Sequence, residues 1–243
     1  MVLRKLSGVS EKSANENANG ITSQKQSQAD RAYRTLKRQI LDNELPPGTQ
    51  LLEAEASSLL GMSRTPVREA MIRLQEEGMV EIRPRHGMRV LGISARDVKE
   101  MYQVLTGLES IAAYVVASRG VSETEHEAMR KAVLDMDSAL EADDLDAWAR
   151  ADERFHTLLV GLSGNQRLIG VVSQFVEQAH RARMLTLRLR PKPTQSNRDH
   201  EALVDAIAAG DAEAARRIHH EHRERAGRII IELLEKLGFI AGS

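Results

Sequence analysis

After Gly92 the sequence leaves little room for strands, because apolar residues recur at helical spacing almost without interruption. Glycine, proline, aspartate and asparagine residues divide this region at the points where helices would end. The pattern predicts six helices, over residues 95–118, 122–141, 144–162, 166–189, 195–209 and 212–237. Helices of this length joined by short turns pack as an antiparallel bundle. We therefore expect residues 93–243 to form one all-helical domain.

The stretch before Gly92 follows a different plan, with shorter helices. Apolar spacing predicts three of them, over residues 29–43, 53–60 and 64–77. The first ends before Pro46-Pro47, which cannot continue it. Gly61 ends the second helix, and Ser63 can cap the third. Two helices joined by a tight glycine turn are typical of a helix-turn-helix.

Two strand-like runs follow the third helix, over residues 79–83 and 88–91. They flank the turn sequence Pro84-Arg85-His86-Gly87, which has a basic tip. A hairpin in this position would be the wing of a winged helix-turn-helix. The expected fold class is therefore mostly α, with an N-terminal winged helix-turn-helix followed by an antiparallel all-α helical bundle.

The domain plan has three parts. Residues 1–28 are rich in polar side chains and poor in large apolar ones, so we expect a flexible tail. Residues 29–92 would be the winged helix-turn-helix domain, and residues 93–243 the all-helical domain. The helical domain carries more acidic than basic residues, so any contact with nucleic acid is expected in residues 29–92.

Composition excludes several classes of protein. With 42% hydrophobic residues, 28% charged residues and a net charge of −1, the chain resembles a soluble globular protein. It has no cysteine, so imidazole and carboxylate are its strongest metal ligands. No apolar run matches a signal peptide or a membrane span. We therefore expect a cytoplasmic protein with no membrane partner.

The third helix has the pattern of a DNA-recognition helix. Its inward positions are apolar, whereas Arg64, Thr65 and Arg68 face outward near its start. At that end of a recognition helix, a guanidinium can bond the O6 and N7 atoms of guanine together. Arg85 and His86 in the wing are suited to phosphates or to the minor groove.

These residues resemble a known family. The run Leu60-Gly61-Met62-Ser63-Arg64-Thr65-Pro66-Val67-Arg68-Glu69-Ala70-Met71 and the hairpin Pro84-Arg85-His86-Gly87 look like the DNA-binding domain of GntR-family regulators. The resemblance implies a homodimer on a palindromic operator in double-stranded DNA. It also implies that Arg64, Thr65 and Arg68 contact bases or phosphates, and that His86 and Gly87 enter the minor groove.

A set of histidines and one aspartate falls on the inward faces of the predicted bundle. Asp152 and His156 are four residues apart, so they share a face of one helix. His200 and His222 begin or join apolar stripes on two other helices. Buried groups of this kind are costly unless they are paired or bound to metal. One aspartate and three histidines suit a divalent ion, with zinc as the first candidate and nickel, manganese or iron as alternatives.

The helical region also resembles the effector domain of the FadR-type branch of this family, which is called the FCD domain. The motifs are Asp152-x-x-Phe155-His156, Ser163-Gly164-Asn165, His200-Glu201, Gly210-Asp211 and His222. The resemblance implies that Asp152, His156, His200 and His222 bind the metal, with a carboxylate effector beside it. Six helices match the shorter VanR-type variant. Leu105 stands where many relatives have an arginine that reaches the effector.

Several polar residues keep two interpretations. Arg150 and Arg181 are candidates for an effector clamp, as are Arg183 and Arg188, but each could equally be a solvated surface residue. Glu109 lies on an apolar stripe, either as a core acid paired with an arginine or as part of the pocket. His219 and His220 adjoin His222, and either could be the ligand in its place.

Three function classes compete. A DNA-binding regulator controlled by a small metabolite accounts for both domains. A metal-dependent enzyme would leave the DNA-reading domain unexplained, and the sequence has no HExxH motif and no clear general base. An architectural DNA-binding protein without an effector would leave the inward histidines unexplained. The regulator is the reading that we expect.

Overall fold

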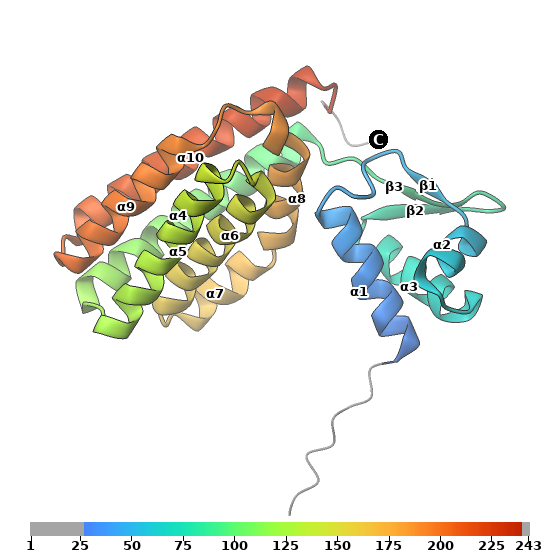
Figure 1. Cartoon of the computed structure of the whole chain (residues 1–243), viewed down its shortest axis with the longest axis horizontal. Coiled ribbons are helices and arrows are strands. Elements are labelled where there is room, and N and C mark those ends of the chain that lie inside the picture. The colour runs from blue at the N-terminus through green and yellow to red at the C-terminus, as the bar shows by residue number, and fades with distance from the viewer. Residues whose placement is uncertain (1–26, 240–243) are drawn as a thin grey trace, which may run out of the picture.

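The computed structural model describes residues 27–239, which form a small N-terminal unit and a larger helical bundle (Figure 1). The N-terminal unit contains α1 (Gln28–Leu41), β1 (Gln50–Leu51), α2 (Glu53–Leu60), α3 (Arg64–Glu76), β2 (Val80–Arg83) and β3 (Gly87–Val90). The bundle contains α4 (Ala95–Arg119), α5 (Glu123–Glu141), α6 (Leu145–Leu162), α7 (Gln166–Ser173), α8 (Val176–Thr186), the 3-10 helix η1 (Leu187–Leu189), α9 (Thr194–Ala208) and α10 (Ala212–Lys236). The fold class predicted from the sequence is confirmed.

Most of the predicted tail, residues 1–26, lies outside the described residues. Of its last two positions, Gln28 begins α1 and Ser27 is the N-cap residue just before it. The Ser27 side chain accepts a hydrogen bond from the Asp30 amide and so caps this helix.

The N-terminal unit has its own apolar core. Leu36 and Ile40 of α1 pack with Val67, Met71 and Leu74 of α3 in a cluster separate from those of the bundle. Gly61 closes α2 in the left-handed conformation, with a φ of 62°, as its position predicts.

The expected cap at Ser63 is wrong in detail. Ser63 occupies the N-cap position of α3, but its side chain makes no capping hydrogen bond. The sequence shows which residue precedes a helix, whereas the rotamer of a short exposed side chain depends on its surroundings.

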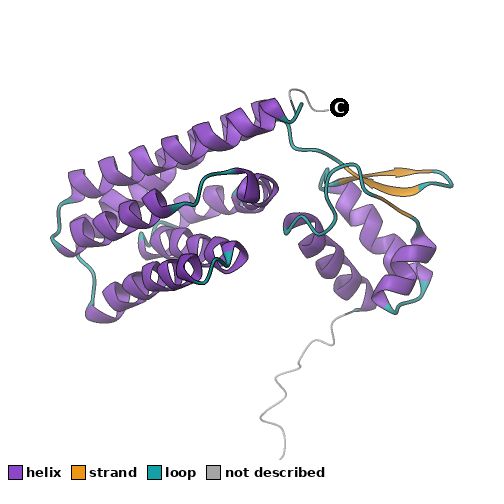
Figure 2. Cartoon of the chain, turned by 45° about the horizontal axis from the view of Figure 1, so that its top comes forward, coloured by secondary structure: helices purple, strands orange, loops and turns teal. Residues whose placement is uncertain are grey.

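The wing belongs to a three-stranded sheet in the order β1-β3-β2 (Figure 2). The hairpin of β2 and β3 was predicted, with Arg83 now paired to Gly87. The third strand, β1, was not predicted. It is only two residues long, and it pairs Gln50 with Arg89 and Leu51 with Met88. A strand this short has no alternating pattern that a sequence could reveal.

The bundle is built around the two long helices α4 and α10, which pack against each other along their lengths (Figure 1). Gly227 permits this approach, because a Cβ atom there would lie 2.8 Å from the ring of Tyr102. None of the helices within residues 27–239 combines the length and apolar character needed to cross a lipid bilayer.

One predicted helix is two. The segment expected as a single helix over residues 166–189 breaks at Gln174-Phe175 into α7 and α8. The amides of Gln174 and Phe175 bond to carbonyls three residues back, which tightens the end of α7, and Phe175 packs against the apolar core. No glycine or proline marks the break. The described bundle therefore has seven α-helices, and the six-helix count that suggested the VanR-type variant is wrong for this chain.

Gly87 offers a test of the wing. Its φ is +71°, and a Cβ atom there would lie 2.3 Å from the carbonyl oxygen of Leu51 in β1. Replacing Gly87 by alanine should therefore displace β1 as well as strain the turn. Gly78→Ala is a matched control, because Gly78 has a φ of +69° and nothing within 4 Å of the added atom. It should cost about 1–2 kcal/mol from left-handed strain alone.

Hydrogen exchange of the β1 and β3 amides measures both variants. We expect Gly87→Ala to accelerate exchange well beyond the control. Equal effects in the two variants would show that β1 does not depend on the close approach at Gly87.

Candidate metal centre and DNA interface

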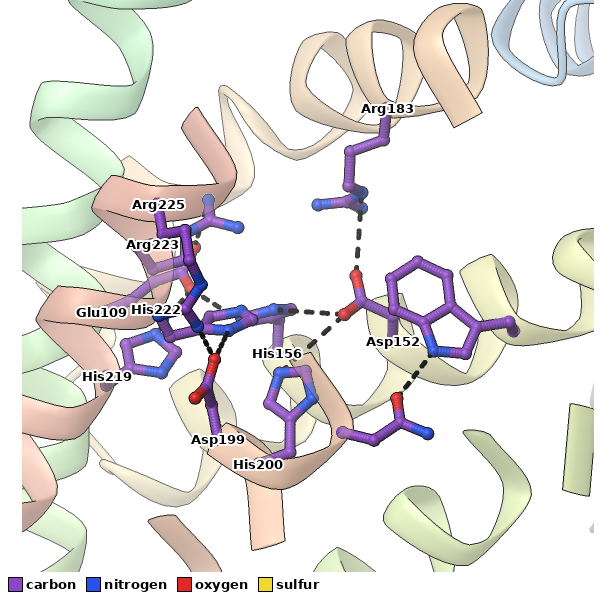
Figure 3. Close-up of polar contacts among 12 residues, drawn as sticks. Glu109, Asp152, His156, Arg183, Asp199, His200, His219, His222, Arg223 and Arg225 are labelled. Atoms are coloured by element: carbon purple, nitrogen blue, oxygen red, sulfur yellow. Dashed lines mark hydrogen bonds and ion pairs between the residues drawn. The ribbon is translucent and has the colours of Figure 1, made fainter. Parts of the chain in front are cut away.

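The four residues predicted as metal ligands meet inside the bundle (Figure 3). Asp152 and His156 come from α6, His200 from α9 and His222 from α10. One potential ligand atom from each lies within 4.8 Å of all the others. All four are buried, and His156, the most accessible, retains 7% of its surface.

Packing between α6 and α9 fixes the positions of these side chains. The Phe155 ring on α6 lies 4.4 Å from the His200 ring on α9, centroid to centroid. Nearby, the indole N–H of Trp148 donates to the amide oxygen of Asn197 at 2.8 Å. These two side-chain contacts link α9 to α6 within one turn of His200, while α9 itself packs on α10, α5 and α4.

The donor atoms at the centre of the cluster lack ordinary partners. Both ring nitrogens of His200 are buried without a hydrogen-bond partner. Asp152 Oδ1 lies 3.7 Å from His156 Nε2 and 3.8 Å from His200 Nε2, which is too far for a hydrogen bond. Buried donors left unpaired are costly. A set of nitrogen and oxygen atoms that converge without bonding to one another fits a bound cation.

Two carboxylates engage the outer nitrogens of the ligand histidines. Asp199 Oδ2 lies 3.2 Å from His222 Nδ1, and Glu109 Oε2 lies 3.0 Å from His156 Nδ1. Carboxylates placed in this way orient metal-ligating histidines and increase their basicity. The sequence did not predict a role for Asp199. It adjoins His200, but helical periodicity turns it toward the flank of α10, where Arg225 also contacts it.

Burial and neighbouring charge set the protonation of the cluster. Burial and the nearby ring of His156 lower the pKa of His222 to about 3. Burial and His222 also hold the pKa of His200 well below its usual value. For Asp152, burial opposes ionisation, but His156, Arg183 and His200 outweigh it and depress the carboxyl pKa. Neutral His200 and His222 and an ionised Asp152 are the forms that bind metals. His156 differs, because burial disfavours its charged form but Glu109 and Asp152 outweigh burial and raise its pKa above the usual value, so that a metal would have to displace a proton there.

His219 belongs to a second group. It is fully buried, and its Nε2 bonds to Glu109 Oε2 at 3.0 Å, so it joins Glu109 and His156 on the other side of the His156 ring. Glu109 also pairs with Arg223 at 3.1 Å, which agrees with the core-acid interpretation. His220 is about half exposed and lies in neither group.

A cavity of about 180 Å³ adjoins both groups. Its walls are mostly apolar, and its polar lining includes Glu109, Glu153, His156 and two arginines. The arginines are Arg183 on α8 and Arg223 on α10, both buried. The Nε atoms of both have no hydrogen-bond partner. Leu105 also lines the cavity, so its apolar side chain stands where the expected arginine would have been.

Of the four arginines proposed from sequence as effector contacts, Arg183 lines the cavity, whereas Arg150, Arg181 and Arg188 do not. Arg150 is exposed on the outer side of α6 and does not line the cavity. Arg181 is buried, but its guanidinium donates to the carbonyl of Leu91 on the far side of α8. Arg223 was missed because it directly follows His222, and adjacent residues on a helix normally diverge by about 100°.

The predicted DNA contacts lie on the outside of the N-terminal unit. Arg64, Thr65 and Arg68 are exposed at the start of α3. Arg68 is only loosely held, with its Nε 3.7 Å from Glu53. Arg85 and His86 are exposed at the tip of the wing, whereas the neighbouring Gly87 is half-buried against β1. The two exposed sets are available to a nucleic acid.

Comparison with known proteins gives the same two parts. Residues 28–90 match the bacterial regulatory proteins of the gntR family, and residues 100–225 match the FCD domain. An uncharacterized HTH-type transcriptional regulator of Agrobacterium vitis is 45% identical over 131 residues, which cover 53% of this chain and 77% of the relative. The HTH-type transcriptional repressor RspR of Escherichia coli is 28% identical over 84% of this chain and 89% of its own length.

Solved structures share the fold. The E. coli protein McbR/YncC superposes with a TM-score of 0.72 at 21% identity, over 85% of this chain and 98% of that protein. The matched segments, the geometry of the helix-turn-helix and the helical bundle agree. The chain belongs to the GntR family of bacterial transcriptional regulators and carries an FCD domain behind its DNA-binding domain.

Proposed function

We propose that this regulator binds a palindromic operator as a homodimer, and that a small carboxylate metabolite, bound at a metal ion in the bundle, controls its affinity for DNA. The observation that carries the proposal is the convergence of four buried donor residues beside a cavity lined by two buried arginines. A regulator uses both the N-terminal unit and the helical bundle, whereas an enzyme would leave the N-terminal unit without a role.

The donor set supports a divalent metal ion. Asp152, His156, His200 and His222 supply one oxygen and three nitrogens, which suits zinc first and nickel, manganese or iron as alternatives. The unpaired nitrogens of His200 fit this role, because coordination would satisfy a donor that otherwise stays unpaired. When bound, the ion would supply a positive anchor for a ligand carboxylate.

The cavity supports a small ligand with one acidic end. Arg183 and Arg223 place positive charge at its polar side, and Leu105, Val160 and Val172 form part of its apolar wall. Its volume of about 180 Å³ equals roughly six water molecules in the liquid, so the ligand is small. A short carboxylic acid with an apolar tail matches both sides.

The outer face of α4 supports a second copy as partner. Val104, Ile111 and Tyr114 are 41%, 48% and 39% exposed and recur at helical spacing along this face. Exposed apolar residues that gather on one face mark interaction surfaces. A twofold pair formed there would present two recognition helices to the two halves of a palindrome.

Arg64 and Arg68 test the DNA interface. Arg64→Ala and Arg68→Ala should each weaken binding to the preferred sequence by about tenfold or more, because one bidentate base contact contributes roughly 1–3 kcal/mol. Selection from a random oligonucleotide library, followed by titration of the selected site, measures both preference and affinity. Melting temperature should not change, since both side chains are exposed.

Arg130→Ala, an exposed position on the bundle, is the matched control and should bind as the native chain does. An unchanged sequence preference in both α3 variants would refute the assignment of these contacts.

The metal site has its own test. His156→Ala and His222→Ala should lose most of the metal found by elemental analysis, and they should lose the rise in melting temperature that metal gives the native chain. Metal at a hundredfold excess over its dissociation constant stabilises a folded state by about 2.7 kcal/mol. Chelator should lower the native melting temperature toward that of the variants.

His219→Ala is the sharpest control, because this buried ring lies on the same helix three residues from His222 but outside the set of four. It should keep the metal. Retention of full metal by the His156 and His222 variants would rule out the site, and loss in His219→Ala alone would move the ion to the group of Glu109, His156 and His219.

A series of aliphatic acids tests the ligand class. Straight-chain carboxylates from acetate to hexanoate should raise the melting temperature of the metal-loaded protein, whereas the corresponding primary amides should not, because they lack the charge that Arg183 and Arg223 would pair. Arg183→Gln should weaken the carboxylate effect. Equal stabilisation by acid and amide would contradict recognition of a carboxylate.

A further inference from the structure

Helix α8 lies between the cavity and the N-terminal unit, which is called the DNA-reading unit from here on. Figure 1 shows it at the edge of the bundle that faces α1. Val176, Ala179 and Arg183, at helical spacing, line the cavity. The neighbouring face carries Glu177, His180 and Arg181, which contact the N-terminal unit or the linker near Gly92. Glu177 pairs with Lys37 at 2.7 Å, and Arg181 donates to the carbonyl of Leu91.

His180 makes a buried contact to the N-terminal unit. Its Nε2 bonds to Asp42 Oδ1 at 2.9 Å, and Asp42 is the C-cap residue of α1 in the DNA-reading unit. Its Nδ1 lies 2.9 Å from Glu153 Oε2 on α6, which is an ion-pair distance without the geometry of a hydrogen bond. Only 9% of the His180 side chain is exposed. One imidazole thus joins a carboxylate of the DNA-reading unit to a carboxylate of the bundle.

Charge favours this arrangement. Burial and the nearby Arg183 disfavour the charged ring of His180, but Glu153 and Asp42 outweigh them and raise its pKa above the usual value. A protonated imidazole can donate its Nε2–H to Asp42, and its positive charge attracts the nearby carboxylate of Glu153. Charge-assisted hydrogen bonds of this kind are about twice as strong as neutral ones.

The inner partner of His180 belongs to the cavity wall. Glu153 lines the cavity and directly follows Asp152 in the sequence. A ligand that pairs with Arg183 in the cavity therefore shares that space with Glu153. Any displacement of Glu153 costs His180 one of its two partners.

We propose that His180 holds the DNA-reading unit against the helical bundle through its contact with Asp42. We further propose that a ligand in the cavity weakens this contact by displacing Glu153, the second carboxylate beside His180. The docking itself does not depend on a metal or a ligand, whereas its use in signalling rests on the proposed function. A ligand can shift an equilibrium only by binding its two states differently. Here the two states are the DNA-reading unit docked through Asp42 and the same unit released.

The absence of cysteine makes the test direct. Glu76→Cys in α3 and Arg150→Cys in α6 place two spin labels at exposed positions, one on each unit. Pulsed electron spin resonance on the labelled chain, diluted with an excess of the unlabelled native chain, then gives the distribution of distances between the two units within one chain. The otherwise native chain should give one dominant distance.

His180→Gln and Asp42→Asn in this labelled background should each raise the undocked fraction roughly tenfold, as loss of a charge-assisted hydrogen bond implies. The double variant should do little more than either single one, because both changes remove the same contact. Glu153→Gln should broaden the distribution in the same direction, since it removes the negative charge beside His180.

His220→Gln is the matched control, because His220 is half exposed and pairs only with Glu224 on its own helix. It should leave the distribution as in the native chain. A native distribution in both His180→Gln and Asp42→Asn would overturn the docking through His180. A native distribution in Glu153→Gln alone would overturn the link to the cavity.

Metal content and melting temperature, measured on the same samples, separate this proposal from the proposed function. The His180, Asp42 and Glu153 variants should keep their fold and their metal, because none of them is in the set of four. If no sample binds metal, the proposed function fails while the distance measurements still decide the docking through His180.

Discussion

The cost of burying charge at the centre of the bundle governs the arrangement of this molecule. Glu109 lies beyond the reach of solvent, so it needs partners, and it has three: His156, His219 and Arg223. Removing one partner of a buried ion pair costs about 3–5 kcal/mol, because it leaves the other charge uncompensated. The ion pairs of Glu109 therefore fix the positions of α6 and α10, which supply its partners, relative to α4. The need to neutralise Glu109 therefore explains two features together: the packing of α4 against α6 and α10, and the positions of His156 and His219.

The buried side chains show which features of the site can be predicted from the sequence. Helical periodicity places Asp152, His156, His200 and His222 on inward faces, and the structure brings them together as that pattern predicts. Periodicity reports which way a residue points, but not what it meets. Asp199 and Arg223 each adjoin a predicted ligand, so a pattern of inward stripes assigns them to the wrong face. Their roles follow from the crossing of α9 and α10, which only the tertiary structure supplies.

The same limit explains the errors in the fold. The break at Gln174-Phe175 has no glycine or proline to announce it, because the packing of Phe175 into the core ends α7 rather than any local breaker. The strand β1 forms because the glycine at position 87 lets its backbone approach the wing, and two residues carry no periodicity. Arg150 was proposed as an effector contact from its charge alone, and the structure places it on the surface. Long helices and their caps depend on neighbouring residues in the sequence, so they can be predicted. Short strands, interruptions within a helix and the partners of charged side chains depend on the tertiary structure.

The two faces of α8 have a consequence for how such a regulator can change over generations. Residues 176, 179 and 183 face the cavity, and residues 177, 180 and 181 face the DNA-reading unit, so the two sets do not share a position. Under the proposed function, substitutions at positions 176 and 179 would alter which ligand fits the cavity without changing the side chains that contact the DNA-reading unit. If the proposed function holds, a descendant of this protein can acquire a new ligand while it keeps the same operator, through changes on one side of a helix of 11 residues.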